Sequence, residues 1–307
     1  MAPDAAARPS ARSLPRLTSA RAGLTRVVEG VNQHGEVVSL AIPAERALTV
    51  YVDRRELVTL MTLGAHPELL VLGFLRNQRL VASIGDIESV TVDWDVGAAA
   101  VTTRHGIAEL QQRTAKRVVT TGCGQGSMFG ALMDDVDGIV LPPAMLQQQA
   151  LYGIVNTIRL ADSIYKAAGS VHGCGLFRGE ELLMFVEDVG RHNAVDTLAG
   201  WMWMQPDDAV DGAPGGLPAR HQGLRGGDKV FYTTGRLTSE MVIKAAQMGV
   251  PIIISRSGTT EMGLEVARKL GLCTVGRATN KHFICYSAPH RLQLQPQLAG
   301  ARLRAVA

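Results

Sequence analysis

The chain has 307 residues, of which 46% are hydrophobic and 19% charged, as is typical of a globular protein with a sizeable core. Its net charge of +3 comes from residues 1–26, where five arginines stand against Asp4 alone, so the remainder is close to neutral. That balance argues against nucleic-acid binding. No apolar run is long enough for a membrane span or a signal peptide, so we expect a cytoplasmic protein with no membrane partner.

The first 26 residues are rich in arginine, proline and serine, and we expect them to form a disordered tail. An organelle transit peptide has a similar arginine-rich, acid-poor composition. Pro3, Pro9 and Pro15 disfavour the amphipathic helix that such a peptide forms, so the tail is the preferred interpretation.

Residues 27–120 are expected to form an α+β subdomain. Short β-rich runs divided by turn residues predict antiparallel strands with hairpins over 27–58. Pro67 suits the first turn of a helix, which the apolar pattern predicts over 69–80. Apolar and polar residues then alternate over 90–96, which predicts a strand with one exposed face.

Residues 121–307 are expected to form an α/β core. A long helix over 145–164 is followed by predicted strands and helices in alternation. This order favours a largely parallel sheet covered by helices on both faces. The glycine- and proline-rich stretch 205–227 is predicted to be a mobile insertion. The predicted strands are 182–186, 229–233, 251–254, 273–275 and 283–286, and the later helices are 192–204, 239–248 and 261–270.

A glycine-rich stretch over 121–127 surrounds one cysteine, Cys123, with Gly122, Gly124 and Gly126. Successive backbone N–H groups in such a loop form an electropositive nest, which favours the thiolate that acts as a nucleophile. The alternative is an inert thiol in a turn. The four cysteines of the chain show no CxxC spacing, so neither a disulfide framework nor a zinc site is predicted.

The polar stretch 187–194 follows a predicted strand and begins a predicted helix, where ligand sites of α/β sheets gather. We expect Asp188 or Glu187 to orient His192, and Arg191 to bind an anion. The alternative is that Asp188 caps the helix and His192 lies in solvent. Another glycine-rich stretch, 170–175, is predicted to be a turn, in which His172 has either a structural or a functional role.

Two further turns follow predicted strands and carry Arg236 and Arg256. Because helix N-termini bind phosphate and carboxylate groups, two such turns at successive strand ends favour a phosphate-rich ligand. The alternative is a pair of capped helices with incidental arginines. The segment 277–282, between two predicted strands, adds three basic or titratable side chains.

With these motifs in order, the sequence resembles the formate dehydrogenase accessory sulfurtransferase family (FdhD/NarQ). The matching stretches extend over about residues 27–290, and the Gly-Arg-His-Asn-Ala motif at 190–194 is the most specific of them. The resemblance implies a three-layer α/β/α sandwich, similar to cytidine deaminase but without zinc, and a homodimer. It also implies sulfur transfer from a cysteine desulfurase to the molybdenum cofactor, Mo-bis-molybdopterin guanine dinucleotide, for the catalytic subunit of formate dehydrogenase.

The resemblance also implies roles for particular residues. Cys123 would carry sulfur as a persulfide, with His172, Asp188, Arg191 and His192 in support. The family's loop has a second cysteine where this chain has Gly126, so an internal disulfide at that place is excluded. One thiolate suffices to hold and donate a persulfide, and Cys174 is a second thiol to consider. The residues implied to contact the cofactor are Arg277, Ala278, Thr279, Asn280, Lys281 and His282.

Two other functions compete with this interpretation. The missing second cysteine leaves open a chaperone that binds the cofactor for formate dehydrogenase maturation without transferring sulfur. A hydrolytic deaminase fits the implied fold, but the H-x-E and P-C-x-x-C ligand patterns that hold its zinc are absent.

Overall fold

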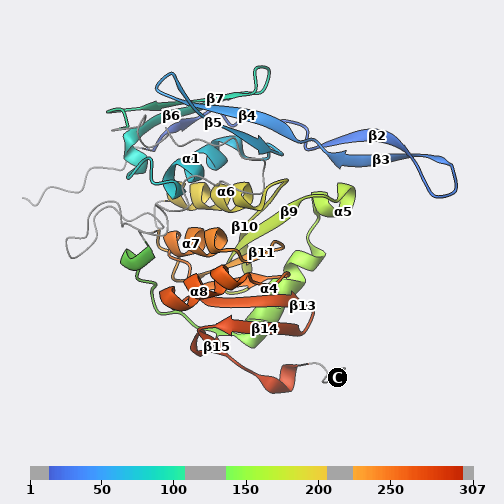
Figure 1. The fold of residues 1–307 in the computed structure, drawn as a ribbon, viewed down its shortest axis with the longest axis vertical. Coiled ribbons are helices and arrows are strands. Elements are labelled where there is room, and N and C mark those ends of the chain that lie inside the picture. The colour runs from blue at the N-terminus through green and yellow to red at the C-terminus, as the bar shows by residue number, and fades with distance from the viewer. Residues whose placement is uncertain (1–13, 108–135, 206–223, 300–307) are drawn as a thin grey trace, which may run out of the picture.

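The computed structural model describes residues 14–107, 136–205 and 224–299 (Figure 1). It consists of a five-stranded sheet and a six-stranded sheet with helices between them, and a two-stranded arm that projects from the body. This confirms the mixed α/β class that the sequence predicts. The likeness to cytidine deaminase stays a prediction.

The five-stranded sheet comes from the N-terminal part of the chain and has the order β1-β6-β7-β4-β5. Buried apolar side chains of this sheet pack against helix α1 (Pro67–Asn77). The helix begins at Pro67, as predicted. A short 3₁₀ helix, η1 (Ile84–Asp86), precedes β6. The strands are β1 (Arg16–Leu17), β4 (Arg46–Val52), β5 (Arg55–Thr62), β6 (Ile87–Asp93) and β7 (Ala98–Thr103).

The predicted tail over 1–26 is wrong at its C-terminal end. Strand β1 pairs in parallel with β6, and Thr18 donates its hydroxyl proton to Glu68 at 2.7 Å. Backbone pairing and this buried carboxylate fix residues that composition alone assigns to a disordered segment. Residues 1–13 lie outside the described part of the chain.

The arm is a hairpin of β2 (Thr25–Val31) and β3 (Val37–Pro43), which is the first of the predicted hairpins. It extends away from both sheets (Figure 1). Several of its apolar side chains face solvent, including Val27, Val31 and Val37, which are 71%, 71% and 67% exposed.

The six-stranded sheet has the order β10-β9-β11-β12-β13-β14. Strands β11, β12 and β13 are mutually parallel, whereas β9 and β14 run antiparallel to their neighbours. The predicted largely parallel sheet is therefore wrong, because hairpins rather than crossovers add both outer pairings. The strands are β9 (His172–Arg178), β10 (Glu181–Asp188), β11 (Lys229–Thr233), β12 (Ile252–Ser255), β13 (Cys273–Thr279) and β14 (His282–Ser287).

The stretch 170–175 is not the predicted turn, because most of it belongs to β9. Added Cβ atoms at Gly173 and Gly175 would lie 2.9 and 3.0 Å from the rings of Phe185 and Phe177. These glycines therefore make room for aromatic side chains within a buried strand. The sequence alone predicts a turn here from the number of glycines, whereas in the fold the glycines belong to a strand.

Helices cover both faces of this sheet. Helix α4 (Gln148–Leu160) packs on one face through a core cluster that includes Leu151 and Ile154. Helices α6 (Arg191–Met204), α7 (Ser239–Gln247) and α8 (Glu261–Leu270) contribute to the larger core cluster on the other face. The predicted long helix over 145–164 is instead two helices, since α4 ends at Leu160 and α5 (Ile164–Ala168) begins after a break.

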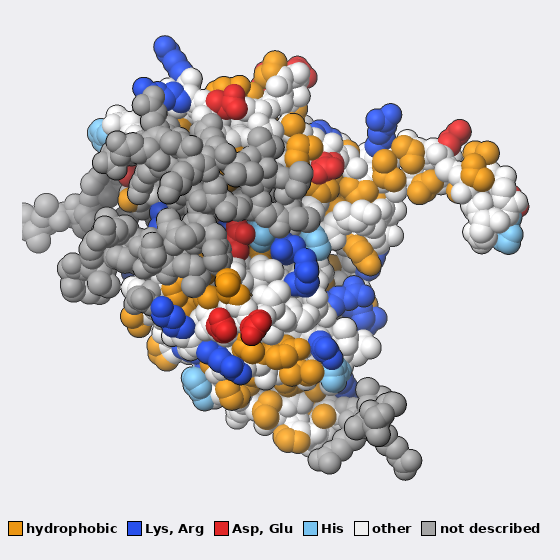
Figure 2. Space-filling model, viewed as in Figure 1, with side chains coloured by type: hydrophobic (Ala, Val, Ile, Leu, Met, Phe, Trp, Pro, Cys, Tyr) orange, Lys and Arg blue, Asp and Glu red, His pale blue; other side chains and the backbone are white. Residues whose placement is uncertain are grey.

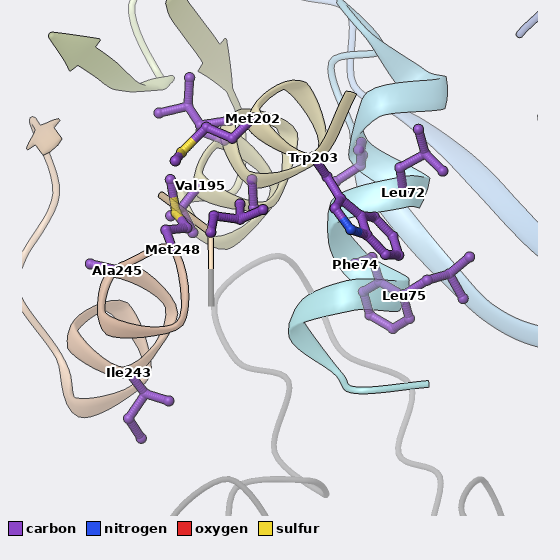
Figure 3. Packing of buried hydrophobic residues seen from close by; sticks show 14 of the residues in the cluster. Leu72, Phe74, Leu75, Val195, Met202, Trp203, Ile243, Ala245 and Met248 are labelled. Carbon is purple, nitrogen blue, oxygen red and sulfur yellow. The ribbon is translucent and has the colours of Figure 1, made fainter. Parts of the chain in front are cut away.

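Helices α1 and α6 join the two sheets into one core. Added Cβ atoms at Gly73 and Gly200 would lie 1.7 Å from the backbone oxygen of Asp196 and 2.0 Å from that of Leu69. Both glycines thus permit an approach of the two helices that no side chain allows. Figure 3 shows Leu72, Phe74 and Leu75 of α1 around Trp203 of α6, with Met202 and Val195 directed toward Ala245 and Met248.

The predicted mobile insertion over 205–227 is wrong for residues 224–227, because Leu224 is buried and Gly226 packs against the backbone of Met248. Residues 206–223 lie outside the described part. The division into domains stays a prediction.

The short elements are η2 (Val136–Gly138), β8 (Leu146–Gln147), η4 (Pro289–Arg291), β15 (Leu292–Gln293) and η5 (Pro296–Leu298).

Candidate anion-binding site

The candidate residues of the second half meet at one edge of the six-stranded sheet. Strands β10, β11, β12 and β13 end at this edge, and the antiparallel strands β9 and β14 begin there. The sheet therefore brings together residues that are up to 110 positions apart in the sequence. They are His172, Asp188, Arg191, His192, Arg236, Arg256, Arg277 and His282.

Hydrogen bonds join the successive turns at this edge. The Thr234 hydroxyl accepts from the Gly173 N–H at 3.0 Å, and the Ser255 hydroxyl donates to the Gly235 oxygen at 2.7 Å. The backbone N–H of Arg277 donates to the Ser257 oxygen at 2.7 Å. The strand-end turns thus form one continuous surface rather than separate loops.

Three exposed arginines on this surface have no side-chain hydrogen bond or ion pair within the described residues: Arg236, Arg256 and Arg277. On the face drawn in Figure 2, Lys or Arg side chains lie beside histidines near the centre of the molecule. Guanidinium groups without a carboxylate partner are available to bind phosphate or carboxylate groups of a ligand.

Arg191 is a fourth arginine at this edge, and it is only 6% exposed. It lies in the first turn of α6, and its Nε atom has no hydrogen-bond partner within the described residues. Gly235 makes room for it, since an added Cβ would lie 3.0 Å from Arg191 Cδ. A buried, unpaired guanidinium donor at a helix N-terminus favours binding of an anion.

His172 lies at the start of β9, close enough to Arg191 and Arg236 to be affected by their charges. Burial lowers its pKa, and Arg191 and Arg236 lower it further, so His172 is neutral near pH 7. A neutral imidazole adds a hydrogen-bonding group without adding charge to the site.

Asp188 has a structural role that differs from both predicted ones. It accepts hydrogen bonds from the Thr62 hydroxyl, from the backbone N–H groups of Leu63 and Gly190, and from the Asn193 amide. It neither orients His192 nor caps α6 at its N-cap position, which is Gly190. Asp188 instead connects the end of β5 to the turn that begins α6.

Glu187 is likewise not a partner of His192. Its carboxylate accepts from the backbone N–H groups of Ile164 and Tyr165, at the start of α5. The prediction that Asp188 or Glu187 orients His192 is therefore wrong. Both carboxylates satisfy backbone donors of other elements, Asp188 after β5 and Glu187 at the start of α5.

The carboxylate beside His192 is Glu240, which the sequence prediction does not include. Glu240 Oε2 lies 3.3 Å from His192 Nε2, and His192 is buried rather than in solvent. Burial, followed by the charges of Lys244 and Arg191, lowers the pKa of His192 to about 2. A neutral imidazole therefore faces Glu240, and the contact is not an ion pair at neutral pH.

A buried ion pair lies behind this contact. Lys244 donates to Asp196 at 2.9 Å and lies 3.3 Å from Glu240, while Asn77 donates to Asp196 at 2.7 Å. Burial alone would lower the pKa of Lys244, but the two carboxylates raise it overall. This network links α1, α6 and α7, and Glu240 connects it to His192.

The segment 277–282 lies at the same edge, as the connection from β13 to β14. Arg277, Thr279, Asn280, Lys281 and His282 are exposed, and the Tyr152 hydroxyl of α4 donates to the Lys281 oxygen at 3.1 Å. The side chain of Ala278 differs from its neighbours, because it is buried in the core cluster with Val275. Ala278 is therefore not itself exposed to a ligand, unlike the other five residues of the segment.

Cys123 and its neighbours Gly122, Gly124 and Gly126 lie outside the described residues, so their predicted role stays a prediction. Cys174 is described and is fully buried. It donates to the Thr233 hydroxyl at 3.4 Å, and burial raises its pKa to about 12. A buried thiol of this kind is a poor substitute for the missing second cysteine.

The described residues contain no group of three or more His, Cys, Asp or Glu side chains placed to hold a metal ion. Within the same part of the chain, no helix combines the length and apolar character needed to cross a membrane. The basic edge is the edge of the six-stranded sheet that carries Arg191, Arg236, Arg256 and Arg277. Together with the fold, it defines an α/β protein with a surface suited to an anionic ligand.

Comparison with known proteins identifies the family. Residues 43–293 match the model of the FdhD/NarQ family, and the chain belongs to this family. A protein of Bacillus pumilus named sulfur carrier protein FdhD is 30% identical over 249 residues, which cover 81% of this chain and 88% of that protein. The protein of the same name from Bacillus subtilis is 29% identical over 264 residues, covering 85% and 94%.

A solved structure supports the fold. A protein from Desulfotalea psychrophila, described as a formate dehydrogenase accessory protein, superposes with a TM-score of 0.66. The match covers 88% of this chain and 98% of the other, at 22% sequence identity. At that identity the likeness shows the shared fold alone.

Proposed function

We propose that the chain is a sulfur carrier that takes sulfur from a cysteine desulfurase and delivers it to the molybdenum cofactor of formate dehydrogenase. Its membership of the FdhD/NarQ family and the name of its relatives, sulfur carrier protein, support this proposal. The substrate is Mo-bis-molybdopterin guanine dinucleotide. The partners are the desulfurase and the catalytic subunit of formate dehydrogenase.

The observation that carries the proposal is the basic edge. Arg236, Arg256 and Arg277 lie at the ends of three adjacent parallel strands, and none has a carboxylate partner within the described residues. A guanine dinucleotide contains phosphate groups in series, and an array of guanidinium groups suits such a ligand. The exposed residues of segment 277–282 extend the same surface.

The proposed chemistry requires one thiol. The Cys123 thiolate accepts a sulfur atom from the persulfide of the desulfurase, whose own thiolate leaves, and Cys123 becomes a persulfide. The acceptor then donates an electron pair to the terminal sulfur, the S–S bond breaks, and the Cys123 thiolate leaves, so that the acceptor is oxidised by two electrons as it gains the sulfur. No second cysteine is consumed, which suits a chain with Gly126 in the loop and Cys174 buried.

The oligomer and the location belong to the same proposal. We expect a homodimer in the cytoplasm, where a desulfurase and an apoenzyme can both reach the basic edge. The exposed arm of β2 and β3 is the described surface best suited to contact a second copy, because its apolar side chains lack a cover.

The proposal is tested with Cys123→Ala and Arg236→Ala in a strain that lacks the native gene and expresses formate dehydrogenase. Cys123→Ala is expected to abolish formate dehydrogenase activity while GDP binding by the purified protein is unchanged. Arg236→Ala is expected to weaken GDP binding about tenfold, the loss of one charge-assisted contact. Arg268→Ala is the matched control. Arg268 is an exposed arginine in the last turn of α8, at the end of the helix away from the turn that carries Arg256.

The outcome also separates the competing function. If Cys123→Ala restores full formate dehydrogenase activity, the chain acts as a chaperone that binds the cofactor, and sulfur transfer by Cys123 is refuted. If Arg236→Ala and Arg268→Ala bind GDP as the wild type does, the basic edge is not the nucleotide site.

A further inference from the structure

Two cysteines outside the proposed sulfur-transfer loop lie next to each other. Cys273 is on β13 and Cys285 on β14, and their Sγ atoms are 3.9 Å apart. The two strands are antiparallel neighbours, with Val275 directly opposite Cys285. Cys273 is therefore diagonal to Cys285 on the same face of the sheet, a relation in which side chains of adjacent strands make contact.

The two thiols differ in accessibility. Cys273 is fully buried in the core cluster beside α4, whereas Cys285 is half-buried. A hydrogen bond between the sulfurs lowers the pKa of Cys285 and raises that of Cys273. Cys285 is thus the thiol that a soluble oxidant reaches and that ionises first, and the thiolate is the reactive form.

We propose that Cys273 and Cys285 are an oxidisable pair that hydrogen peroxide converts into a disulfide at the base of segment 277–282. In the first step the Cys285 thiolate attacks one peroxide oxygen, the O–O bond breaks, and sulfenic acid and hydroxide form. In the second step the Cys273 thiol attacks the sulfenic sulfur and water leaves. The two thiols together lose two electrons, which reduce one peroxide.

The geometry permits this bond with side-chain rotation. A disulfide requires an S–S distance of about 2.0 Å and Cα atoms no more than about 7 Å apart. The two sulfurs are already 3.9 Å apart across paired strands, and rotation about χ1 can shorten this distance toward that of a disulfide. The third described cysteine, Cys174, has a Thr233 hydroxyl rather than a thiol beside it and provides an internal comparison.

The disulfide would restrain segment 277–282, which is part of the proposed ligand surface. Pairing between β13 and β14 is irregular between Gly276 and Thr279, and both Arg277 and Asn280 have positive φ. The β ladder therefore holds this connection weakly. A covalent link between the strands below it would limit opening of the hairpin, so backbone amides of 277–283 should exchange more slowly after oxidation.

The test uses the full chain with Cys123→Ala, so that the thiol proposed to carry sulfur cannot react with the peroxide. The reduced protein is treated with hydrogen peroxide, unfolded, alkylated with iodoacetamide and mapped by mass spectrometry. We expect a peptide pair linked through Cys273 and Cys285, about 2 Da lighter than the two reduced peptides. Cys174 should be recovered as the alkylated thiol, and dithiothreitol should restore both others.

Two variants assign the roles of the thiols. Cys285→Ser should leave Cys273 reduced, because the buried thiol is not reached. Cys273→Ala should leave Cys285 as a sulfenic acid that dimedone traps, and the Cys285→Ser result stands alone if this core variant does not fold. The proposal is overturned if both cysteines stay reduced at a peroxide concentration that fully oxidises glutathione, or if oxidation leaves amide exchange of 277–283 unchanged. Neither readout depends on sulfur transfer or nucleotide binding.

Discussion

At the scale of single residues, the stretch 188–193 shows how neighbouring polar groups acquire different environments. Asp188 satisfies donors from β5 and from its own turn, His192 faces Glu240, and Arg191 has an unpaired Nε beside Gly235. Arg191 thus keeps a donor available for a ligand, whereas the carboxylate of Asp188 is occupied by protein donors. At the N-terminus of α6, Arg191 therefore adds a buried donor to the exposed arginines of the anion site.

The buried, neutral His192 has a consequence for stability in acid. The pKa of His192 in the folded chain is about 2, below its ordinary value of 6.5, so between these pH values the unfolded chain binds an additional proton. Its stabilising contribution is complete above pH 6.5 and decreases as pH falls, by about 1.4 kcal/mol per pH unit.

His192→Asn removes this proton uptake. From pH 7 to pH 5, the wild type should lose about 2 kcal/mol more of its unfolding free energy than the variant loses. Urea unfolding at the two pH values measures the difference. Parallel losses in the two proteins would show that His192 is already protonated in the folded state.

The sequence indicates which residues gather at this edge, but not how they pair. Arg236 and Arg256 follow the ends of predicted strands, and parallel strands place their ends together. Two partners of Asp188, Thr62 and Leu63, lie about 125 positions earlier in the chain, and Glu240 reaches His192 only because α6 and α7 pack side by side. Such long-range pairs leave no periodic signal in one sequence.

At the scale of elements, the contact of α1 with α6 depends on the absence of two side chains. An added Cβ at Gly200 would lie 2.0 Å from the backbone oxygen of Leu69, well inside van der Waals contact. The helices would have to separate, which disturbs Trp203 and the side chains around it (Figure 3).

Gly200→Ala is therefore expected to lower the free energy of unfolding by about 3 kcal/mol, the upper range for overpacking a core. Gly23→Ala is the matched control, because an added Cβ there meets nothing within 4 Å. Chemical denaturation of both variants measures the change. Equal stability of the two would contradict the close approach of α1 and α6.

Strand β9 shows why one element was not predicted correctly. Gly173 and Gly175 resemble turn residues in the sequence, whereas in the fold they lie beside Phe185 and Phe177. The signal that could have identified the strand comes after it, because Gly179 and Glu180 form a two-residue hairpin turn before a second apolar run. A hairpin at that turn requires a strand before it.

At the scale of the whole molecule, the arm is the part that the body does not cover. An isolated two-stranded hairpin is marginally stable in water, and this one exposes Val27, Val31 and Val37. A homodimer that buries these side chains would stabilise the arm and the assembly together.

We expect Val27→Asp with Val31→Asp to convert the proposed homodimer into a monomer, since two buried carboxylates oppose association. Light scattering after size-exclusion chromatography measures the mass. Val96→Asp is the matched control, because Val96 is 73% exposed and lies on the turn between β6 and β7. A dimer that persists in the double variant would place the interface elsewhere.

The central claim is that this molecule carries sulfur on one cysteine, and intact-protein mass spectrometry tests it most directly. After incubation with a cysteine desulfurase and cysteine, the wild type should gain about 32 Da, one sulfur atom, located on Cys123 and removed by dithiothreitol. Cys123→Ala should gain nothing, while Cys174→Ala should be loaded as the wild type is. No adduct on a wild type that still binds GDP would contradict the account.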